Sequence, residues 1–176
     1  MIFTPTELPD VVVVDLEQRE DERGFFARAW CAREFAEAGL STELVQCNLS
    51  FNEQRGTLRG MHFQRAPHAE AKLVRCTRGA IYDVAVDLRP GSPTHGRWVG
   101  VELTAENRRA LYVPEGCAHG YQTLADGTET FYQVSEWYTP QAEGGVRWDD
   151  PAFGIEWPLP DPVLSPKDAS WPDYRP

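Results

Sequence analysis

Short apolar runs recur along the whole chain, separated by turn-forming residues. In the run at residues 81–88, Tyr, Val, Val and Leu occupy the even positions, and Ile, Asp, Ala and Asp occupy the odd positions. Successive side chains of an extended backbone point to opposite faces, so this run predicts a β-strand with one apolar and one mixed face. Comparable runs lie at residues 11–16, 43–51, 58–64, 72–79, 97–104, 110–116, 121–125 and 130–138.

The segments between these runs predict tight turns, because they place Gly or Pro beside polar residues, as in Arg78-Gly79, Glu115-Gly116 and Asp126-Gly127. The charged segment 17–24 is predicted to be a loop. One short helix is predicted within residues 29–39, where Gly39 can end it.

Short strands without intervening helices predict an all-β fold, an antiparallel sandwich or jelly roll with one or a few short helices. The tail from Asp149 is rich in Pro and Trp, and we expect it to wrap over the body as irregular structure.

Length and charge narrow the class of protein. A chain of 176 residues is predicted to form a single domain over residues 1–176, since a core of this size can bury roughly two-thirds of the surface that the unfolded chain exposes. The net charge of −10 argues against partners bound through a general positive field, so neither nucleic acid nor an anionic membrane is expected. No apolar run approaches the roughly 20 residues that span a bilayer, and no secretion signal is evident, so a cytoplasmic location is expected.

Four cysteines, at positions 31, 47, 76 and 117, are widely spaced and form no Cys-x-x-Cys pair. This spacing indicates neither a zinc knuckle nor a dithiol redox motif. In a cytosolic chain of this length, we expect the four to be small buried side chains.

Two of the four histidines lie in strand-like sequence beside glycine: His62 in RGMHFQ and His119 in GCAHGY. Such a histidine is ordinarily a hydrogen-bonded structural residue of the sheet. Jelly-roll proteins often hold a metal through several histidines and a carboxylate, but this chain has no His-x-His pair, and His68 follows Pro67 in a loop-like segment. A site built from His62 and His119 would need carboxylates that the adjacent sequence does not supply, so no metal site is predicted.

Other polar residues also have ordinary structural interpretations. Lys72, one of only two lysines, stands at the entrance to a strand, where a lysine is usually solvated. Tyr132 and Tyr138 are six positions apart, so one strand can project both to the same face. Asp168 would ordinarily cap a turn or a helix.

Arg59 precedes His62 by three positions, and strand alternation puts the two side chains on opposite faces. A bulge at Gly60 would bring them to one face. The pattern by itself leaves both arrangements open.

Eight segments follow one another in a specific order: DERGFF at 21–26, VQCNLS at 45–50, TLRGMHFQ at 57–64, KLVRCTRGAIYDVAVDLRPGSPTHG at 72–96, LYVPEGCAHGY at 111–121, YQVSEWY at 132–138, RWDDPAFGIEWP at 147–158 and LSPKD at 164–168. Together they resemble the dTDP-4-dehydrorhamnose 3,5-epimerase family. The similarity extends from about Asp21 to Asp168. Each segment alone would be a weak signal, but eight in register are specific.

The resemblance implies a cupin-type jelly-roll subunit that forms a homodimer and needs no metal or organic cofactor. It also implies a dTDP-linked 4-keto-6-deoxy sugar as substrate and inversion at C3 and C5, the carbons beside the ketone. On the family pattern His62 matches the base, Asp168 the carboxylate that orients it, Lys72 the cation near the ketone oxygen, and Tyr132 the acid on the opposite face. The positions that match nucleotide or substrate contacts are Arg23, Arg28, Cys47, Asn48, Leu49, Arg59, Lys72, His119, Tyr138, Glu143 and Lys167, with Tyr138 at the position that stacks on thymine.

The chain departs from the family pattern at three positions. Arg28 stands where the family usually has Glu, Cys47 where it usually has Asp, and Cys117 where it usually has Phe. The first change reverses the charge at a ligand-contacting position. Alternatives therefore stay open: an epimerase that inverts only C3 or only C5, a related ketoisomerase, or a cupin that binds a sugar nucleotide without converting it.

Overall fold

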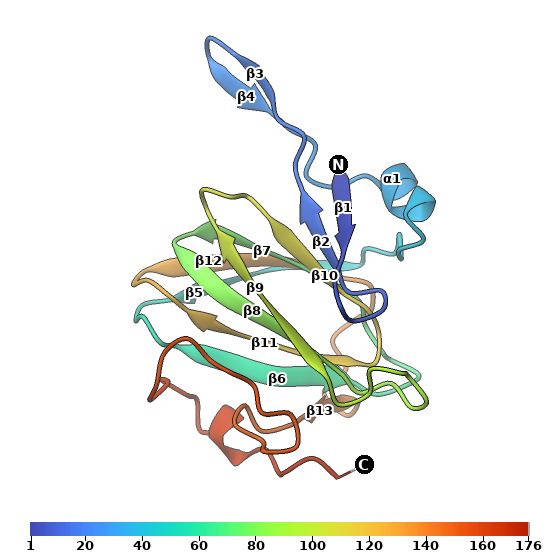
Figure 1. Ribbon diagram of the computed structural model, residues 1–176, viewed down its shortest axis with the longest axis vertical. Coiled ribbons are helices and arrows are strands. Elements are labelled where there is room, and N and C mark those ends of the chain that lie inside the picture. Colours follow the sequence, from blue (N-terminus) through green and yellow to red (C-terminus); the bar gives the residue numbers. More distant parts are fainter. Residues whose placement is uncertain (176) are drawn as a thin grey trace.

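The computed structural model describes residues 1–175 and consists mainly of two antiparallel β-sheets packed face to face (Figure 1). One sheet has six strands in the order β1 (Ile2–Pro5), β2 (Val12–Asp15), β10 (Ala110–Val113), β7 (Lys72–Arg78), β12 (Thr128–Val134) and β5 (Gln46–Asn52). The other has five, in the order β13 (Glu143–Gly145), β6 (Leu58–Gln64), β11 (Cys117–Thr123), β8 (Ala80–Asp87) and β9 (Trp98–Thr104). The predicted all-β jelly-roll sandwich is confirmed.

Strand β8 is largely buried on both faces, although only one of them is apolar throughout. Ile81 and Ala85, at odd positions, pack in the core between the two sheets with residues such as Val74 of β7. Val84 and Val86, at even positions, pack on the other side of the sheet in a cluster that includes tail residues Phe153, Ile155 and Trp157. The mixed face of this strand is therefore the one that faces the interior of the sandwich.

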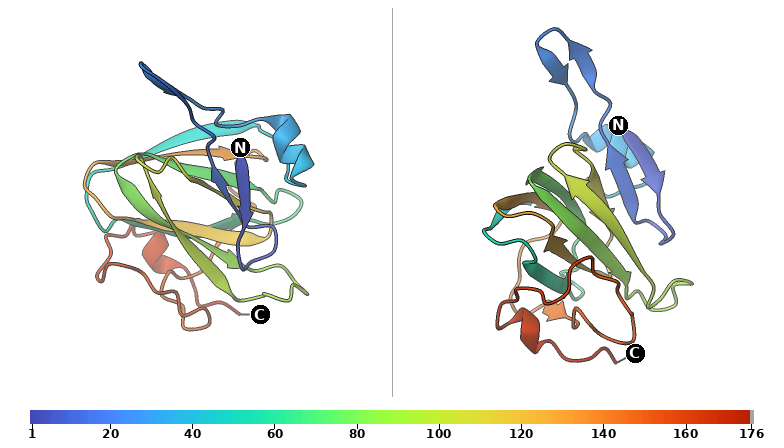
Figure 2. Two further views of the ribbon diagram at one scale, coloured as in Figure 1. Left: turned by 45° about the horizontal axis from the view of Figure 1, so that its top comes forward. Right: turned by 60° about the vertical axis from the view of Figure 1, so that its left-hand side comes forward.

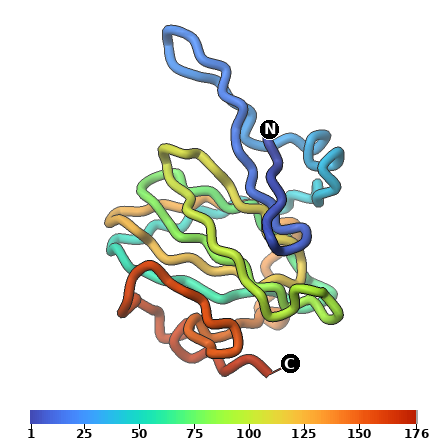
Figure 3. Tube along the Cα trace, viewed as in Figure 1, coloured from blue at the N-terminus to red at the C-terminus, as the bar shows by residue number. Residues whose placement is uncertain are grey.

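The C-terminal tail is irregular, as predicted, and wraps along β6 and β13 (Figure 3). Two pairs of hydrogen bonds, all of 2.9 Å, fix its middle part. Val163 N donates to Gly56 O and Leu58 N donates to Val163 O, while Gln122 Nε2 donates to Leu159 O and Leu159 N donates to Gln122 Oε1. Beyond them the tail forms one 3₁₀ turn, η1 (Asp168–Ser170). These contacts carry Asp168 back to the edge of the five-stranded sheet.

The predicted helix is present as α1 (Ala32–Glu37), and Gly39, with φ of 73°, follows it. The prediction for segment 17–24 was wrong, because a two-stranded hairpin of β3 (Arg19–Asp21) and β4 (Gly24–Phe26) forms there and projects from the body (Figure 2). Its charges indicate that the segment is solvated, and every residue of both strands is exposed. Solvation alone does not distinguish a loop from an exposed hairpin.

Strand β12 is shorter than predicted, since it ends at Val134 rather than Tyr138. The chain leaves the strand where Ser135 Oγ accepts from Ala71 N at 2.8 Å, and Tyr138 N donates to the side chain of Gln46 at 2.9 Å. Tyr132 and Tyr138 therefore do not lie on one strand, which corrects the prediction based on their even spacing.

The cysteines are free thiols in three environments. Cys76 and Cys117 are buried, and burial raises the pKa of their thiols to about 11 and about 12. These two behave as the predicted small core side chains. Cys31 is partly exposed, and Cys47 is exposed on the outer side of edge strand β5, so for Cys47 the prediction of burial was wrong.

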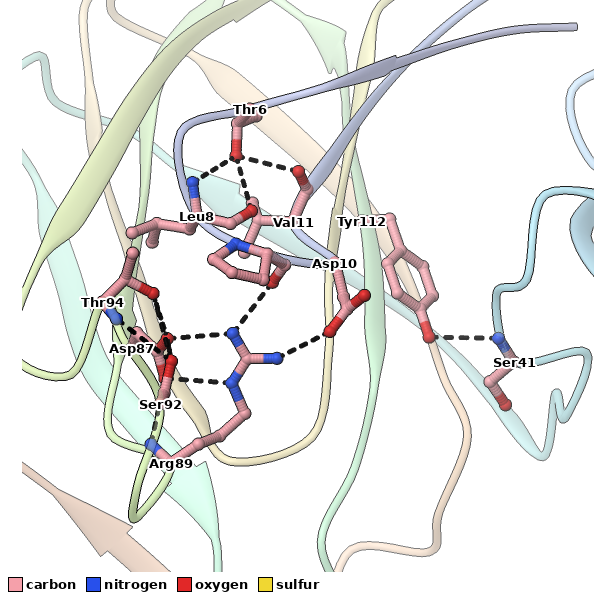
Figure 4. Close-up of polar contacts among 11 residues, drawn as sticks. Thr6, Leu8, Asp10, Val11, Ser41, Asp87, Arg89, Ser92, Thr94 and Tyr112 are labelled. Atoms are coloured by element: carbon pink, nitrogen blue, oxygen red, sulfur yellow. Dashed lines mark hydrogen bonds and ion pairs between the residues drawn. The ribbon is translucent and has the colours of Figure 1, made fainter.

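A polar network ties the β8–β9 connection to the β1–β2 connection (Figure 4). The buried Asp87 carboxylate accepts hydrogen bonds from the Arg89 guanidinium and from the hydroxyls of Ser92 and Thr94, at 2.6 to 2.9 Å. Arg89 also donates to Asp10 at 2.9 Å. Burial raises the pKa of the Asp87 carboxyl, but the hydrogen bonds from Arg89, Ser92 and Thr94 outweigh burial and hold it well below its usual range.

Within residues 1–175, no helix is long and apolar enough to cross a membrane.

Candidate active site

A cleft with two adjoining lobes lies between the two sheets. His62, Lys72 and Tyr132 line both lobes and so mark their junction. The inner lobe has a volume of about 180 Å³ and is completed by Ser50, Arg59, His119, Tyr121 and Asp168. The outer lobe, of about 360 Å³, is completed by Gln46, Asn48, Phe63, Gln64, Glu70, Val134, Tyr138 and Glu143.

His62 and Asp168 form a histidine–carboxylate pair at the inner lobe. His62 Nε2 lies 2.6 Å from Asp168 Oδ1, and the other carboxylate oxygen accepts from Ser165 Oγ at 2.9 Å. Burial raises the pKa of the Asp168 carboxyl, but the hydrogen bond and charge of His62, with help from Ser165 and Lys167, lower it further than burial raises it. An ionised Asp168 fixes the proton of His62 on Nε2 and leaves Nδ1 as the basic nitrogen.

A second pair, His119 and Asp83, lies on the adjacent strands β11 and β8. His119 Nε2 is 2.8 Å from Asp83 Oδ1, and Asp83 is fully buried. His119 stands directly across from His62 in the pairing of β11 with β6. The sequence next to His119 contains no carboxylate partner for it. The partner is Asp83, which precedes it by 36 positions and lies on another strand.

Arg59 and His62 reach the same lobe because β6 carries a bulge. His62 pairs with His119 and Arg59 pairs with Tyr121, so three steps along β6 match two steps along β11. Gly60 has a φ of 146°, and a Cβ there would lie 2.6 Å from Gly120 Cα. Of the two arrangements that the pattern left open, the bulge at Gly60 is the one that occurs.

The opposite wall of the cleft is the six-stranded sheet, which supplies Lys72 from β7 and Tyr132 from β12. Lys72 Nζ lies 3.0 Å from Glu70 Oε1. Burial raises the pKa of the Tyr132 phenol, Tyr121 and Glu70 add to the rise, and Arg59 opposes it. Tyr132 is therefore a neutral phenol near pH 7, able to donate a proton.

The rim of the outer lobe carries three of the predicted binding residues. Lys167 Nζ contacts Glu143 Oε1 at 2.5 Å, and Tyr138 Oη lies 3.4 Å from Glu143 Oε2. Tyr138 is 56% exposed, which leaves its ring free to stack on a planar ligand. Asn48 reaches the same lobe from β5.

Four predicted binding residues do not reach this cleft in their own chain. Arg23 lies in the turn of the β3–β4 hairpin and pairs with Asp21, and Arg28 pairs with Glu34 at 2.6 Å. Cys47 and Leu49 are exposed on the outer side of β5, where side chains alternate with those that face the cleft.

The sequence did not identify several residues of the site, namely Glu70 and Gln46 in the cleft lining and the buried Asp83 behind His119. Asp83 left one signal, since it is an acidic residue on a strand whose apolar face was already assigned. The others lack a distinguishing pattern. Within residues 1–175, no group of three or more His, Cys, Asp and Glu side chains is arranged to hold a metal ion.

Comparison with known proteins agrees with this geometry. A family model described as dTDP-4-dehydrorhamnose 3,5-epimerase matches residues 5–175. The chain belongs to the dTDP-4-dehydrorhamnose 3,5-epimerase family. A relative of that name from Salmonella typhimurium is 47% identical over 98% of this chain and 94% of its own length.

Two further members of the family bear on substrate and outcome. The crystal structure of dTDP-4-dehydrorhamnose 3,5-epimerase from Bacillus anthracis, with TDP and PPi bound, has a TM-score of 0.95 and 40% identity, covering 98% of this chain and 99% of that one. The dTDP-4-dehydrorhamnose 3-epimerase of Streptomyces niveus is 44% identical over 96% of this chain and 81% of its own length.

The three departures from the 3,5-epimerase pattern lie outside both lobes. Arg28 pairs with Glu34, Cys47 faces outward from β5, and Cys117 is buried in the core between the sheets. The lobes contain His62, Lys72, Tyr132 and Asp168, the four residues predicted to be catalytic.

Proposed function

We propose that this protein is an epimerase that inverts C3 and C5 of a dTDP-linked 4-dehydro-6-deoxy sugar by removing and returning protons beside the ketone. The observation that carries the proposal is the placement of a base and an acid on facing sheets. His62 lies on β6 of the five-stranded sheet and Tyr132 on β12 of the six-stranded sheet, and both line the same inner lobe. A sugar ring held between them would meet the two groups on opposite sides.

The first step would be removal of the hydrogen next to the ketone. His62 Nδ1 takes this proton, and the electrons of the C–H bond move onto the ketone oxygen to give an enolate. Asp168 stabilises the imidazolium that forms, in an arrangement worth about 10²- to 10⁴-fold in rate. The enolate oxygen would face the Lys72 ammonium, and a preorganised positive charge in a cleft from which the ligand displaces water lowers the energy of the enolate.

The second step would return a proton from the other side. The Tyr132 phenol donates its proton to the carbon, the electrons of the enolate form the new C–H bond, and the ketone is restored with inverted configuration. His62 then loses its proton to solvent and the Tyr132 phenolate regains one. All groups return to their starting state, and the steps use only side chains of the chain.

The outer lobe would hold the nucleotide. Tyr138 offers an exposed ring for stacking on thymine, and Lys167 lies beside it at the rim. Arg59, whose Nε donates to Asn52 at 2.7 Å, adds a fixed guanidinium at the inner lobe. Placed cations of this kind allow a chain with a net charge of −10 to bind a diphosphate.

We further propose a homodimer in which each hairpin serves the other subunit's cleft. The hairpin projects from its own subunit and exposes Phe25 and Phe26, at 42% and 69%. On the outer side of β5, Leu49 and Phe51 are also exposed, at 66% and 50%. Two exposed apolar surfaces on one chain suit a two-fold contact between identical copies, which would bring Arg23 to a nucleotide site.

Mixed dimers test this arrangement. Co-expression of an Arg23→Ala chain with a His62→Ala chain in equal amounts should restore activity to about one quarter of the wild-type value. Random pairing makes about half of the dimers mixed, and each mixed dimer has one of its two clefts intact and served by an intact hairpin. If the hairpin serves its own cleft, or if the chain is a monomer, no mixture of the two inactive chains should gain activity.

The epimerase proposal is tested by proton NMR with the dTDP-linked 4-keto sugar in deuterated water. Deuterium should enter at both C3 and C5, and the His62→Ala variant should lose this exchange. A wild-type protein that exchanges at neither carbon under saturating substrate would overturn the proposal. Thermal stabilisation by dTDP in that case would indicate a binding protein without catalysis.

A second candidate is an epimerase of C3 alone. It is favoured by the 44% identity to the Streptomyces niveus 3-epimerase, close to the 47% identity to the Salmonella typhimurium 3,5-epimerase. Overall similarity therefore does not separate one inverted carbon from two. In the same NMR experiment, exchange and inversion confined to one carbon would identify this activity.

A further inference from the structure

Glu70 is a carboxylate in the cleft that neither step of the proposed reaction uses. It lines the outer lobe, its side chain is only 12% exposed, and its Oε1 lies 3.0 Å from Lys72 Nζ. Lys72 itself is 11% exposed. The cation assigned to the enolate oxygen therefore already has an anionic partner within the site.

The backbone holds Glu70 firmly in this position. Residues 70 and 72 are two apart on extended chain, so both side chains point to the cleft while Ala71 points away and is buried. Ala71 N donates to Ser135 Oγ at 2.8 Å, and Ser135 N donates to Ala71 O at 3.0 Å. Two hydrogen bonds thus fix the residue between the members of the pair.

We propose that Glu70 is a positioning residue for the reaction: it holds the Lys72 ammonium where the enolate oxygen forms. The inference rests on the proposed epimerase function. An ammonium carries three N–H groups, so Lys72 can keep its bond to Glu70 while a second N–H donates to the substrate oxygen. Without Glu70, the four-carbon side chain of Lys72 would be free to change rotamer, and its charge would no longer be fixed at one point.

The burial of this pair separates it from the ordinary ion pairs of the surface. In the Glu7–Arg97 pair the side chains are 79% and 59% exposed, and such pairs contribute little because water screens and solvates both charges. Glu70 and Lys72 have lost most of that solvation, so removal of one partner leaves the other charge poorly compensated.

Tyr132 provides a second reporter of Glu70. The charged and titratable groups that line the two lobes with Tyr132 are Arg59 and His62 on β6, His119 and Tyr121 on β11, Glu70 and Lys72 at the start of β7, Glu143 on β13, Asp168 on η1, and Tyr138. Burial raises the pKa of the Tyr132 phenol most, the charges of Tyr121 and Glu70 add to the rise, and Arg59 opposes it. Loss of the Glu70 charge should therefore move the alkaline limb of kcat to lower pH, because Tyr132 must be protonated to act as the acid.

Two variants separate charge from position. Glu70→Gln keeps the size of the side chain but removes its charge. It should lower kcat roughly 10- to 100-fold, since a misplacement of about 1 Å can cost about 100-fold in rate. It should also shift the alkaline limb of kcat to lower pH, while KM changes little. Glu70→Asp keeps the charge but shortens the side chain, so it should lower kcat and leave the alkaline limb near the wild-type position.

The matched control is Glu7→Gln, which removes the same charge from an exposed pair and should leave kcat, KM and the pH profile unchanged. If the wild-type protein exchanges deuterium at C3 or C5, either of two results would overturn the proposed role of Glu70 and leave the epimerase proposal standing. One is a wild-type kcat and an unshifted alkaline limb in Glu70→Gln, and the other is a wild-type kcat in Glu70→Asp. Absence of exchange in the wild-type protein would overturn the proposed function and this inference together.

Discussion

Asp168 lies 106 positions after His62 in the chain, yet its carboxylate is 2.6 Å from His62 Nε2. The tail reaches this point because it is hydrogen-bonded to the body along its length and then turns at η1. The orientation and proton of the proposed base thus depend on a segment with almost no regular secondary structure.

Substitution Asp168→Asn tests that dependence. An amide can keep the contact but cannot hold the His62 proton on Nε2 or stabilise the imidazolium, so kcat should fall about 10²- to 10⁴-fold with a smaller change in KM. Steady-state kinetics and the rate of deuterium entry into substrate would measure the effect. A variant with wild-type kcat would show that His62 needs no carboxylate partner.

Substitution Tyr132→Phe should separate the two halves of the reaction. His62 would still remove the proton and return it, or a deuteron, from the same side, so exchange into the substrate should continue. Inversion should fall about 10²- to 10⁴-fold because the opposite side has lost its acid. Proton NMR follows both quantities in one sample. Equal loss of exchange and inversion would contradict the division of roles between the two sheets.

The strands were predictable from sequence because short apolar runs end at turn residues, and in strands such as β2 and β5 the alternation of burial follows the extended backbone. The partners across strands were not. Whether Asp83 meets His119 depends on the register of β8 against β11, and the local sequence of neither strand records that register. The same holds for Asp168 and His62, which only the resemblance to a family joined in advance.

Composition alone did not predict the structure of the exposed parts of the molecule. The charges of the hairpin indicate contact with water, but they do not distinguish a loop from a two-stranded hairpin. Cys47 is exposed because β5 is an edge strand with an uncovered outer side. Both facts depend on what the rest of the chain leaves uncovered, which no local pattern contains.

Substitution Gly60→Ala tests the bulge that brings Arg59 and His62 together. The new Cβ would lie 2.6 Å from Gly120 Cα, so β6 and β11 must separate and both side chains must move. We expect kcat/KM to fall roughly 100-fold. Gly91→Ala is the control, since Gly91 also has a positive φ but has no atom within 4 Å of a new Cβ. Equal losses in the two variants would mean that backbone strain, and not strand separation, causes the effect.

The Asp87 network makes a prediction about stability that can be separated from the active site. The pKa of the Asp87 carboxyl is lower in the folded protein than its ordinary value of 3.8, so the ionised group stabilises the fold at pH values above that ordinary value. This stabilisation should be lost as pH falls below about 4, where the unfolded chain takes up the proton first. In Asp87→Asn, the uncharged amide leaves the Arg89 guanidinium without its buried partner, and the free energy of unfolding at pH 7 should fall by about 3 kcal/mol.

Urea denaturation of the wild type and of Asp87→Asn at pH 7, 5 and 3 would measure this, with the difference between the two proteins shrinking at the lowest pH. Other carboxyls with lowered pKa, such as that of Asp168, are present in both proteins and cancel in the difference. Asp10→Asn is the matched control, because Asp10 bonds the same guanidinium but is 69% exposed, and its loss should cost less than about 1 kcal/mol. A difference between wild type and Asp87→Asn that stays constant from pH 7 to pH 3 would mean that the hydrogen-bond geometry of Asp87, rather than its charge, stabilises the β8–β9 connection.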